Sequence, residues 1–345
     1  MPPRNRYAWF GPLSIGKAFV LSPMRWRAAG ALGGIVALLL TLNALNVANS
    51  YVGRNFMTAI ALRDRGQYLR FAFLYVGVFA ASAVTAVSQQ FVQDRLALSW
   101  RNGLTRHLID RYLSGHTFER ISAKKDIDNP DQRIAEDVRT FTSTLLSFVV
   151  MITNAALTTV AFAGVLWSIS PLLLLTAILY AAGGSMFTVL LGYRLVALNN
   201  LHLKKEADLR YSLIHVRERG EQYEPQEARG IHVRLRRVVR NSRAIIGVTR
   251  NVGFFTSGYN YLVPILPIFI VAPLYLRGKI ELGVVTQSAM AFAQLLGAFS
   301  LIVAQFQSIS AFAAVVRRLS SLWEEMDVTD EGGPQGMPRM SDARA

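Results

Sequence analysis

The residues best suited to chemistry form a short charged run from Asn129 to Asp137, which reads Asn-Pro-Asp-Gln-Arg-Ile-Ala-Glu-Asp. Three carboxylates and one guanidinium within nine residues can make charge-assisted hydrogen bonds, so the run is suited to binding or bracing another surface. Asn129 is a favourable helix N-cap, and Pro130 loses nothing at the first helical position. Gln132 completes a capping box. The run therefore predicts the start of a helix.

Two further features support a helix here. Asp131 lies at the positive end of the predicted helix. Arg133 lies about one turn before Glu136 and Asp137, so we expect an ion pair along the helix. The alternative is a solvated turn that only closes a hairpin between two longer elements.

Other chemistry is poorly represented in the chain. There is no cysteine, and the five histidines show no i,i+3 or i,i+4 pair, so we expect no metal site. No arrangement of nucleophile and base stands out. The sequence G-x-x-x-x-G-K-[ST], which cradles nucleotide phosphates, does not occur, so we expect that this chain cannot hydrolyse ATP by itself.

Composition points to an integral membrane protein. Of the 345 residues, 52% are hydrophobic and only 17% are charged. Each of six stretches without Lys, Arg, Asp or Glu is long enough to cross a hydrocarbon core of ~30 Å as a helix. These predicted spans are residues 28–50, 71–92, 145–167, 171–193, 252–276 and 282–316.

The basic charge of the chain is a topology signal. With a cytosolic N-terminus, 31 of the 37 Lys and Arg residues lie on the cytosolic side, in segments 1–27, 93–144, 194–251 and 317–345. We therefore place both termini in the cytosol and expect no nucleic-acid partner. The excess of Arg over Lys suggests a GC-rich bacterial genome, and we therefore expect the membrane to be the bacterial inner (cell) membrane.

Three regions follow from this pattern: a cytosolic segment 1–27, a membrane domain 28–326, and a tail 327–345 that we expect to be disordered. The two long cytosolic segments read as helical extensions of the spans. In 93–120 an apolar stripe recurs every four residues, formed by Leu96, Trp100, Leu104, Leu108 and Tyr112.

Two motifs carry a family resemblance. Asn129 to Asp137, followed by Val138, Arg139 and Phe141, resembles the first cytosolic loop of one ABC-transporter membrane-domain family. That family includes peroxisomal fatty-acyl half-transporters and bacterial relatives that import vitamin B12 or peptides. Lys205 to Tyr211, continued by Val216 to Glu221, is similar to the EAA-like stretch of the same family. The resemblance covers roughly residues 20–326.

The resemblance implies an all-α membrane protein with six transmembrane helices of the ABC exporter (type 1) kind, acting as a homodimer or paired half-transporter. It also implies a solute that is fatty-acyl, cobalamin or peptide-like, and a partner ATPase domain that holds ATP and Mg²⁺; no cofactor is expected in this chain. Residues 129–137 would form or brace the first coupling helix. The second coupling region, with its tip near 222–229, would use Glu206, Asp208, Arg210, Arg217, Glu218 and Glu221.

Polar side chains inside the spans are candidates for a translocation cavity, because such groups are costly in lipid. The candidates are Asn43, Asn46, Asn49, Asn154, Tyr259, Asn260, Gln287 and Gln294. The alternative is interhelical hydrogen bonding that only fixes packing.

Two other function classes stay open. One is an ATP-independent, proton-coupled peptide-uptake permease of the SbmA/BacA type, for which Asp64 or Glu281 at the external ends of the spans would have to titrate. Because no span contains a carboxylate, the ATP-driven interpretation is favoured. The other is a remnant that no longer transports.

Overall fold

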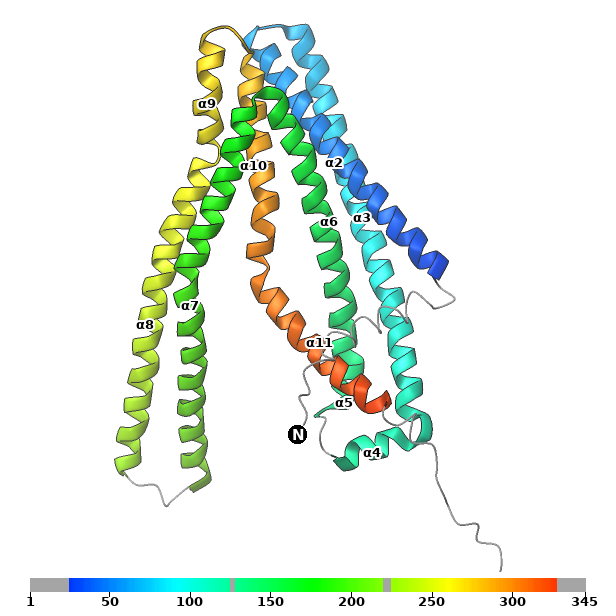
Figure 1. The fold of residues 1–345 in the computed structure, drawn as a ribbon, viewed down its shortest axis with the longest axis vertical. Helices are drawn as coiled ribbons and strands as arrows, with labels where there is room; N and C mark the ends of the chain where they lie inside the picture. Colours follow the sequence, from blue (N-terminus) through cyan, green and yellow to red (C-terminus); the bar gives the residue numbers. More distant parts are fainter. Residues whose placement is uncertain (1–24, 125–127, 220–224, 328–345) are drawn as a thin grey trace, which may run out of the picture. The chain divides into compact units, whose positions relative to one another are not determined.

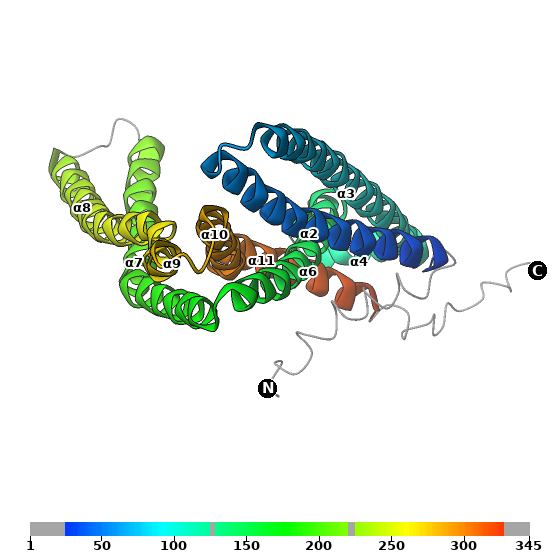
Figure 2. The same cartoon turned by 90° about the horizontal axis from the view of Figure 1, so that it is seen from above.

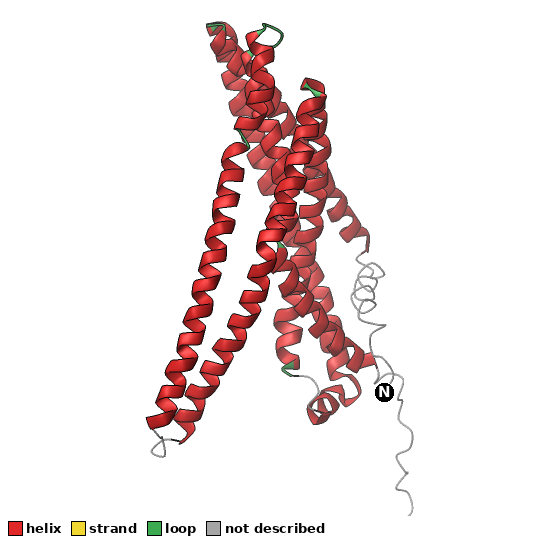
Figure 3. Cartoon of the chain, turned by 60° about the vertical axis from the view of Figure 1, so that its left-hand side comes forward, coloured by secondary structure: helices red, strands yellow, loops and turns green. Residues whose placement is uncertain are grey.

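The computed structural model describes residues 25–124, 128–219 and 225–327, and every regular element in them is a helix (Figures 1 and 3). The predicted segment 1–27 and tail 327–345 therefore lie almost wholly outside the described residues. The helices are α2 (Arg25–Ala61), α3 (Arg65–Leu113), η1 (Ser114–His116), α4 (Thr117–Lys124), α5 (Pro130–Gln132), η2 (Arg133–Asp137), α6 (Val138–Ile169), α7 (Pro171–Arg219), α8 (Pro225–Leu262), α9 (Ile265–Leu276), α10 (Leu282–Ala304) and α11 (Phe306–Asp327).

Six helical segments among the described residues are long and apolar enough to cross a membrane, which confirms the all-α fold expected from the sequence. Large apolar side chains are strongly exposed along them. On α3, for example, Phe73 and Phe79 are 76% and 67% exposed. A helix with such a surface is stable where hydrocarbon replaces water.

Two of the predicted spans are broken. The stretch 252–276 is divided between α8 and α9 at Val263 and Pro264, because a proline has no N–H to continue the ladder. The stretch 282–316 is divided between α10 and α11 at Gln305. This apolar stretch is longer than one membrane crossing because it includes parts of two helices.

The chain forms two compact units, which we describe separately. The first unit comprises the described residues within 1–52, 69–161 and 301–345. Within it, α2, α3 and α6 lie side by side (Figures 1 and 2) and share a core made by Ile35, Leu39, Leu96 and Leu146. The predicted apolar stripe of 93–120 is confirmed as the buried face of α3, since Leu96, Trp100, Leu104 and Leu108 are all buried.

The second unit comprises residues 53–68 and 162–300. Its longest feature is the pair α7 and α8, which run side by side along their length (Figure 1). At the end of this pair, α9 contacts both helices. The tip that joins α7 to α8, residues 220–224, lies outside the described residues.

Candidate functional site

The charged run 129–137 does begin a helix, but not with the predicted cap. Pro130 occupies the first turn as expected, while Asn129 adopts the left-handed conformation (φ 49°) and its side chain makes no capping hydrogen bond. The capping box was therefore wrong. Gln132 instead donates from Nε2 to Oε2 of Glu136 at 3.2 Å. Asparagine suits this position because it tolerates positive φ better than most residues.

The run is the first part of the long helix that ends at Ile169, rather than a short separate helix at a hairpin tip. After one α-helical turn, Arg133 to Asp137 form a π-helical turn that leads directly into α6. Such turns are rare and are frequently found at functional sites. The buried residues of this stretch, Ile134, Asp137 and Val138, all face the interior of the first unit.

Asp137 is held by Arg318 of α11, and we call this pair the Asp137–Arg318 clamp. The Nε and Nη2 atoms of Arg318 donate to the two carboxylate oxygens of Asp137, each at 2.7 Å. The Asp137 residue is only 5% exposed. The hydrogen bond from Arg318 to Asp137 raises the pKa of Arg318 above its ordinary value, so the guanidinium stays charged. A two-pronged pair of this kind fixes orientation as well as distance.

Arg133 reinforces the same contact. The prediction that it pairs with Glu136 or Asp137 was wrong, because its guanidinium turns to α11 instead. Its Nη1 donates to the backbone oxygen of Arg318 at 3.0 Å and to Oγ of Ser321 at 2.7 Å. Its Nε donates to the backbone oxygen of Asp128 at 3.1 Å. Two arginines thus join α11 to the start of the helical segment Pro130–Ile169, which we call the motif helix.

An apolar cluster lies beside the clamp and ties four elements together. Phe141 is its centre: it meets Trp100 edge-on at 5.7 Å and stacks on Phe312 at 5.7 Å. The buried members come from α3, α4, the motif helix and α11, namely Trp100, Leu104, Leu108, Ile121, Ile134, Val138, Phe141, Val315, Leu319, Leu322, Trp323 and Met326. The end of the first unit is therefore one packed block.

Sequence reasoning missed α4. The apolar stripe predicted a helix to residue 120, but α3 ends at Leu113, and Gly115 turns the chain with φ 56°. The short helix α4 then runs across the direction of α3 (Figure 1) and is anchored by Ile121, which is 2% exposed. A glycine just after a helical pattern is a recognised stop signal and was the available clue.

The second predicted region lies on α7 in the second unit. Glu206, Asp208, Arg210, Arg217 and Glu218 are all in this helix, while Glu221 lies outside the described residues. Glu206 lies 3.6 Å from Nε2 of His202. None of the other charged members of this set forms an ion pair within the part of α7 and α8 that the structure describes.

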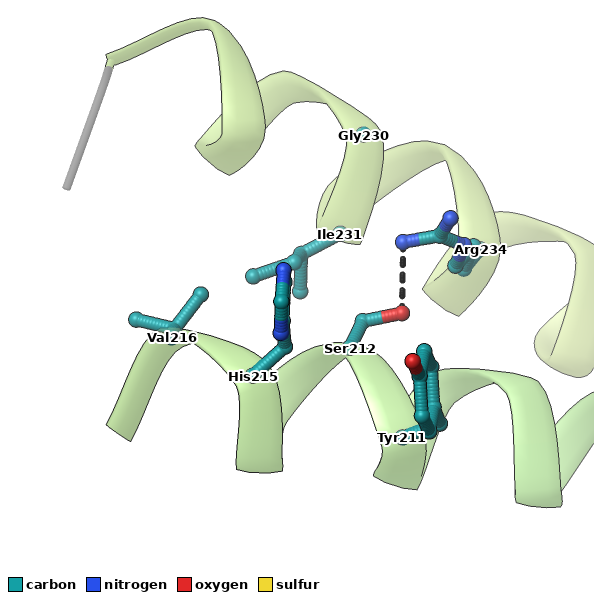
Figure 4. Close-up of a pocket in the computed structure, with 7 residues that line it drawn as sticks. All are labelled: Tyr211, Ser212, His215, Val216, Gly230, Ile231 and Arg234. Atoms are coloured by element: carbon teal, nitrogen blue, oxygen red, sulfur yellow. Dashed lines mark hydrogen bonds between the residues drawn. The ribbon is translucent and has the colours of Figure 1, made fainter. Parts of the chain in front are cut away.

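Polar contacts lock α7 to α8 near this region. Nη1 of Arg234 donates to Oγ of Ser212 across the two helices (Figure 4). Further along the pair, Nδ2 of Asn241 donates to the backbone oxygen of Leu198 at 3.0 Å. A pocket of about 260 Å³ opens between the helices, lined by Tyr211, Ser212, His215, Val216, Gly230, Ile231 and Arg234 (Figure 4).

The predicted cavity residues of the first unit are partly engaged with one another. Nδ2 of Asn43 donates to Oδ1 of Asn154 at 3.0 Å, and Thr158 donates to Oδ1 of Asn43 at 2.8 Å. Asn46 and Asn49 are half-buried on the same helix. The Oδ1 atom of Asn49 is buried without a partner among the described residues.

The predicted cavity residues of the second unit differ widely. Gln294 and Asn260 are exposed, whereas Gln287 is 1% exposed and neither of its amide atoms has a partner among the described residues. Tyr259 stacks on Tyr180 with ring centres 4.2 Å apart. Each hydroxyl donates to the other residue's backbone oxygen, at 2.8 Å from Tyr180 and 3.3 Å from Tyr259.

The helix break beside Tyr259 explains this tyrosine pair. The amide of Val263 bonds to the oxygen of Asn260, so the oxygen of Tyr259 loses its usual partner and accepts from Tyr180 instead. Gly184 makes room for the ring, since a Cβ there would lie 2.2 Å from it.

Comparison with known proteins identifies the family. The family model described as ABC transporter transmembrane region 2 matches residues 16–276. The chloroplastic ABC transporter D family member 2 of Arabidopsis thaliana is 40% identical over 301 residues, which is 86% of this chain and 43% of that protein. An uncharacterized ABC transporter ATP-binding protein of Synechocystis is 34% identical over 311 residues, 88% of this chain and 47% of that protein.

A third relative is the human lysosomal cobalamin transporter ABCD4, which is 30% identical over 125 residues, 35% of this chain and 21% of that protein. The chain spans less than half the length of each of these relatives. The match of the family model over most of the chain agrees with the six apolar helices and with the two sequence motifs that carry the resemblance. The chain therefore belongs to the ABC transporter transmembrane region 2 family and is the membrane part of an ABC-type transporter.

Proposed function

We propose that this chain forms the permease of a dimeric ABC half-transporter of the inner membrane, with its termini in the cytosol. In this proposal ATP is hydrolysed on a nucleotide-binding domain that is a separate chain or a further part of the same protein. The solute is amphipathic or hydrophobic, of fatty-acyl, cobalamin or peptide-like character. The family match supports the permease role, and the name of the lysosomal cobalamin transporter supports a cobalamin-like solute within this class.

The Asp137–Arg318 clamp is the observation that carries the proposal. It connects α11, which follows the last membrane helix, to the helix that leads into the third span. The apolar cluster adds α3 and α4 to the same block. A push on any part of this block is therefore delivered to three membrane helices together, because packed elements move as bodies rather than deforming.

In this proposal α4 is the first coupling helix and residues 129–137 brace it. Ile121 anchors α4 in the apolar cluster, while Glu119 stays exposed for a partner. The second coupling contact is the tip between α7 and α8. The hydrogen bonds from Arg234 to Ser212 and from Asn241 to Leu198 hold α7 and α8 together, so we expect the two helices to move as one rigid body. Alternating access follows when the ATPase domains close and rotate both the block that contains α4 and the pair of α7 and α8.

The test is to purify the protein from its native membrane through a tag on this chain and assay ATP hydrolysis. We expect an ATPase activity that copurifies, either as a second polypeptide or in the tagged one, and that disappears when the nucleotide-binding lysine of that ATPase is replaced. Transport in vesicles should follow the ATP supply. Solute uptake that continues without ATP would contradict the proposal.

A proton-coupled permease is the second candidate, and Glu281 is the residue that favours it. Its Oε2 lies 3.9 Å from Nη2 of Arg54 and accepts from Oγ1 of Thr58 at 3.2 Å, so this carboxylate joins α10 to the end of α2 within the second unit. If protons drive transport, an uncoupler abolishes uptake while ATP stays high, and Glu281→Gln has the same effect. If ATP drives transport, neither treatment abolishes it.

A further inference from the structure

Five arginines of α8 lie in one stripe along the helix. Arg229, Arg236, Arg243 and Arg250 recur every seven residues, and Arg240 lies one turn beyond Arg236. At about 100° per residue the five fall within an arc of about 80°, and at ~1.5 Å per residue they extend over about 31 Å. All five are exposed. We call this set the arginine stripe.

The stripe is on the side of α8 that points away from α7. The residues by which α8 meets α7 include the buried Val238 and Asn241, together with Arg234, which bonds to Ser212. On a helical projection these three lie about 140–160° from the centre of the stripe. Within the second unit, the arginine stripe therefore takes no part in the contact between α7 and α8.

The sequence of α8 leaves this positive charge without compensation. The helix has seven arginines and a single carboxylate, Glu227. Among the described residues no carboxylate pairs with any arginine of the stripe, and Arg250 bonds only to the side chain of its neighbour Asn251. Like charges one turn apart on a helix, such as Arg236 and Arg240, repel each other and destabilise the helix. By contrast, the neighbouring helix α7 mixes Lys and Arg with Glu206, Asp208 and Glu218.

Membrane topology alone does not require this arrangement. The positive-inside bias depends on the number of Lys and Arg residues in a loop, not on their alignment along one helical face. A solvated face would also be served by the mixture of charges that α7 carries. The alignment, the single sign and the exposure together indicate a surface that binds an elongated anionic partner.

We propose that the arginine stripe is a docking surface for an acidic helical segment of a partner protein, whose Glu or Asp residues repeat at heptad spacing. A protein partner is favoured over a lipid surface by the direction of the stripe. α8 continues into the apolar stretch that begins at Val252, so the stripe runs from the membrane boundary away from the bilayer. Lipid headgroups would meet Arg250 and leave Arg229 and Arg236 unused.

The test uses the full-length protein in nanodiscs of neutral phosphatidylcholine. The probe is a fluorescent alanine-based helical peptide whose glutamates repeat the spacing of the five arginines, and binding is followed by fluorescence anisotropy. A peptide of the same composition with scrambled glutamate positions is the control ligand. The matched protein variants are Arg236→Glu and Arg237→Glu, because both side chains are exposed neighbours but only Arg236 belongs to the stripe.

We expect Arg236→Glu to weaken binding of the patterned peptide about tenfold or more, whereas Arg237→Glu changes it by less than about twofold. Arg236→Lys should retain most of the affinity, and added salt should reduce it. Equal binding of the scrambled peptide, or equal losses in the two Glu variants, would overturn the proposal. So would stripe-dependent binding to phosphatidylserine vesicles or to a DNA duplex in preference to the patterned peptide.

Discussion

Arg318 grips both carboxylate oxygens of Asp137, although the two residues are 181 positions apart in the chain. The contact joins the helix after the last span to the charged run that precedes the third span. Arg133 adds two bonds from the run to the same turn of α11. What looks like a surface loop in the sequence is thus a structural joint between distant parts of the first unit.

We predict that Asp137→Asn lowers the stability of the protein by about 2 kcal/mol, since a hydrogen-bonded charge partner is removed while Arg318 remains beside a buried site. The loss is modest because the Arg318 side chain is 47% exposed, so water solvates the guanidinium once its partner is removed. Thermal unfolding in detergent measures the effect. Glu136→Gln is the matched control, since Glu136 is exposed and accepts one bond from the neighbouring Gln132. Equal unfolding midpoints for the two variants would contradict the importance of the clamp.

The sequence was sufficient to predict the six apolar helices and the helical start at Pro130, because both depend on local composition. It failed where the partner is distant. Spacing favoured a pair between Arg133 and Glu136 or Asp137, whereas the guanidinium of Arg133 is used by α11. No local pattern points to residue 318 as the partner of Asp137, and none predicts the π-helical turn at Arg133–Asp137.

The helix breaks show the same difference between features that depend on local sequence and contacts that depend on distant residues. The fifth predicted span is interrupted at Pro264, and no local pattern shows that the hydroxyl of Tyr180 donates to the backbone oxygen of Tyr259 in place of the missing amide. Likewise, the sequence marks Asn43, Asn154 and Gln287 as unusual polar residues in apolar helices. The sequence does not show that Asn43 and Asn154 form a hydrogen bond with each other, whereas Gln287 has no partner among the described residues.

The two adjacent glycines of α7 allow a controlled test of the tyrosine pair. Gly184→Ala should destabilise the protein by about 1–3 kcal/mol, because the new methyl group overlaps the Tyr259 ring. Gly183→Ala meets nothing within 4 Å and should be neutral or stabilise by up to ~1 kcal/mol through helix propensity. Thermal unfolding of the two variants compares them directly. Indistinguishable midpoints would mean that Tyr259 does not lie against Gly184.

Asn43 distinguishes a packing role from cavity lining. We predict that Asn43→Leu costs about 1 kcal/mol, the range measured for interhelical hydrogen bonds in membranes, because Asn154 and Thr158 lose their partner. Asn46→Leu, one turn away at a half-buried position, serves as the control and should have little effect on stability. If Asn46→Leu is the more destabilising of the two in thermal unfolding, the hydrogen-bonded set around Asn43 does not hold the helices together.

Replacing Gln287 with an apolar residue should stabilise the protein, in contrast to Asn43→Leu. Both of its amide atoms are buried without partners among the described residues, so Gln287→Met removes a desolvation penalty at similar volume. We predict a gain in stability of about 1–3 kcal/mol. Gln294→Met, at an exposed position of the same helix, is the control. A lower unfolding temperature for Gln287→Met would show that the amide is satisfied in the protein. A gain in stability with loss of transport would assign the amide to the transport cycle.

The central claim is that the Asp137–Arg318 clamp passes movement from the ATPase to the membrane helices. The most direct measurement is the number of solutes transported per ATP hydrolysed, in proteoliposomes that contain the complete transporter with either native Asp137 or Asp137→Asn. We predict that the variant retains ATP hydrolysis but loses most of its transport, while Arg317→Gln, at an exposed position next to the clamp, keeps the native ratio. An unchanged ratio in Asp137→Asn would contradict the claim.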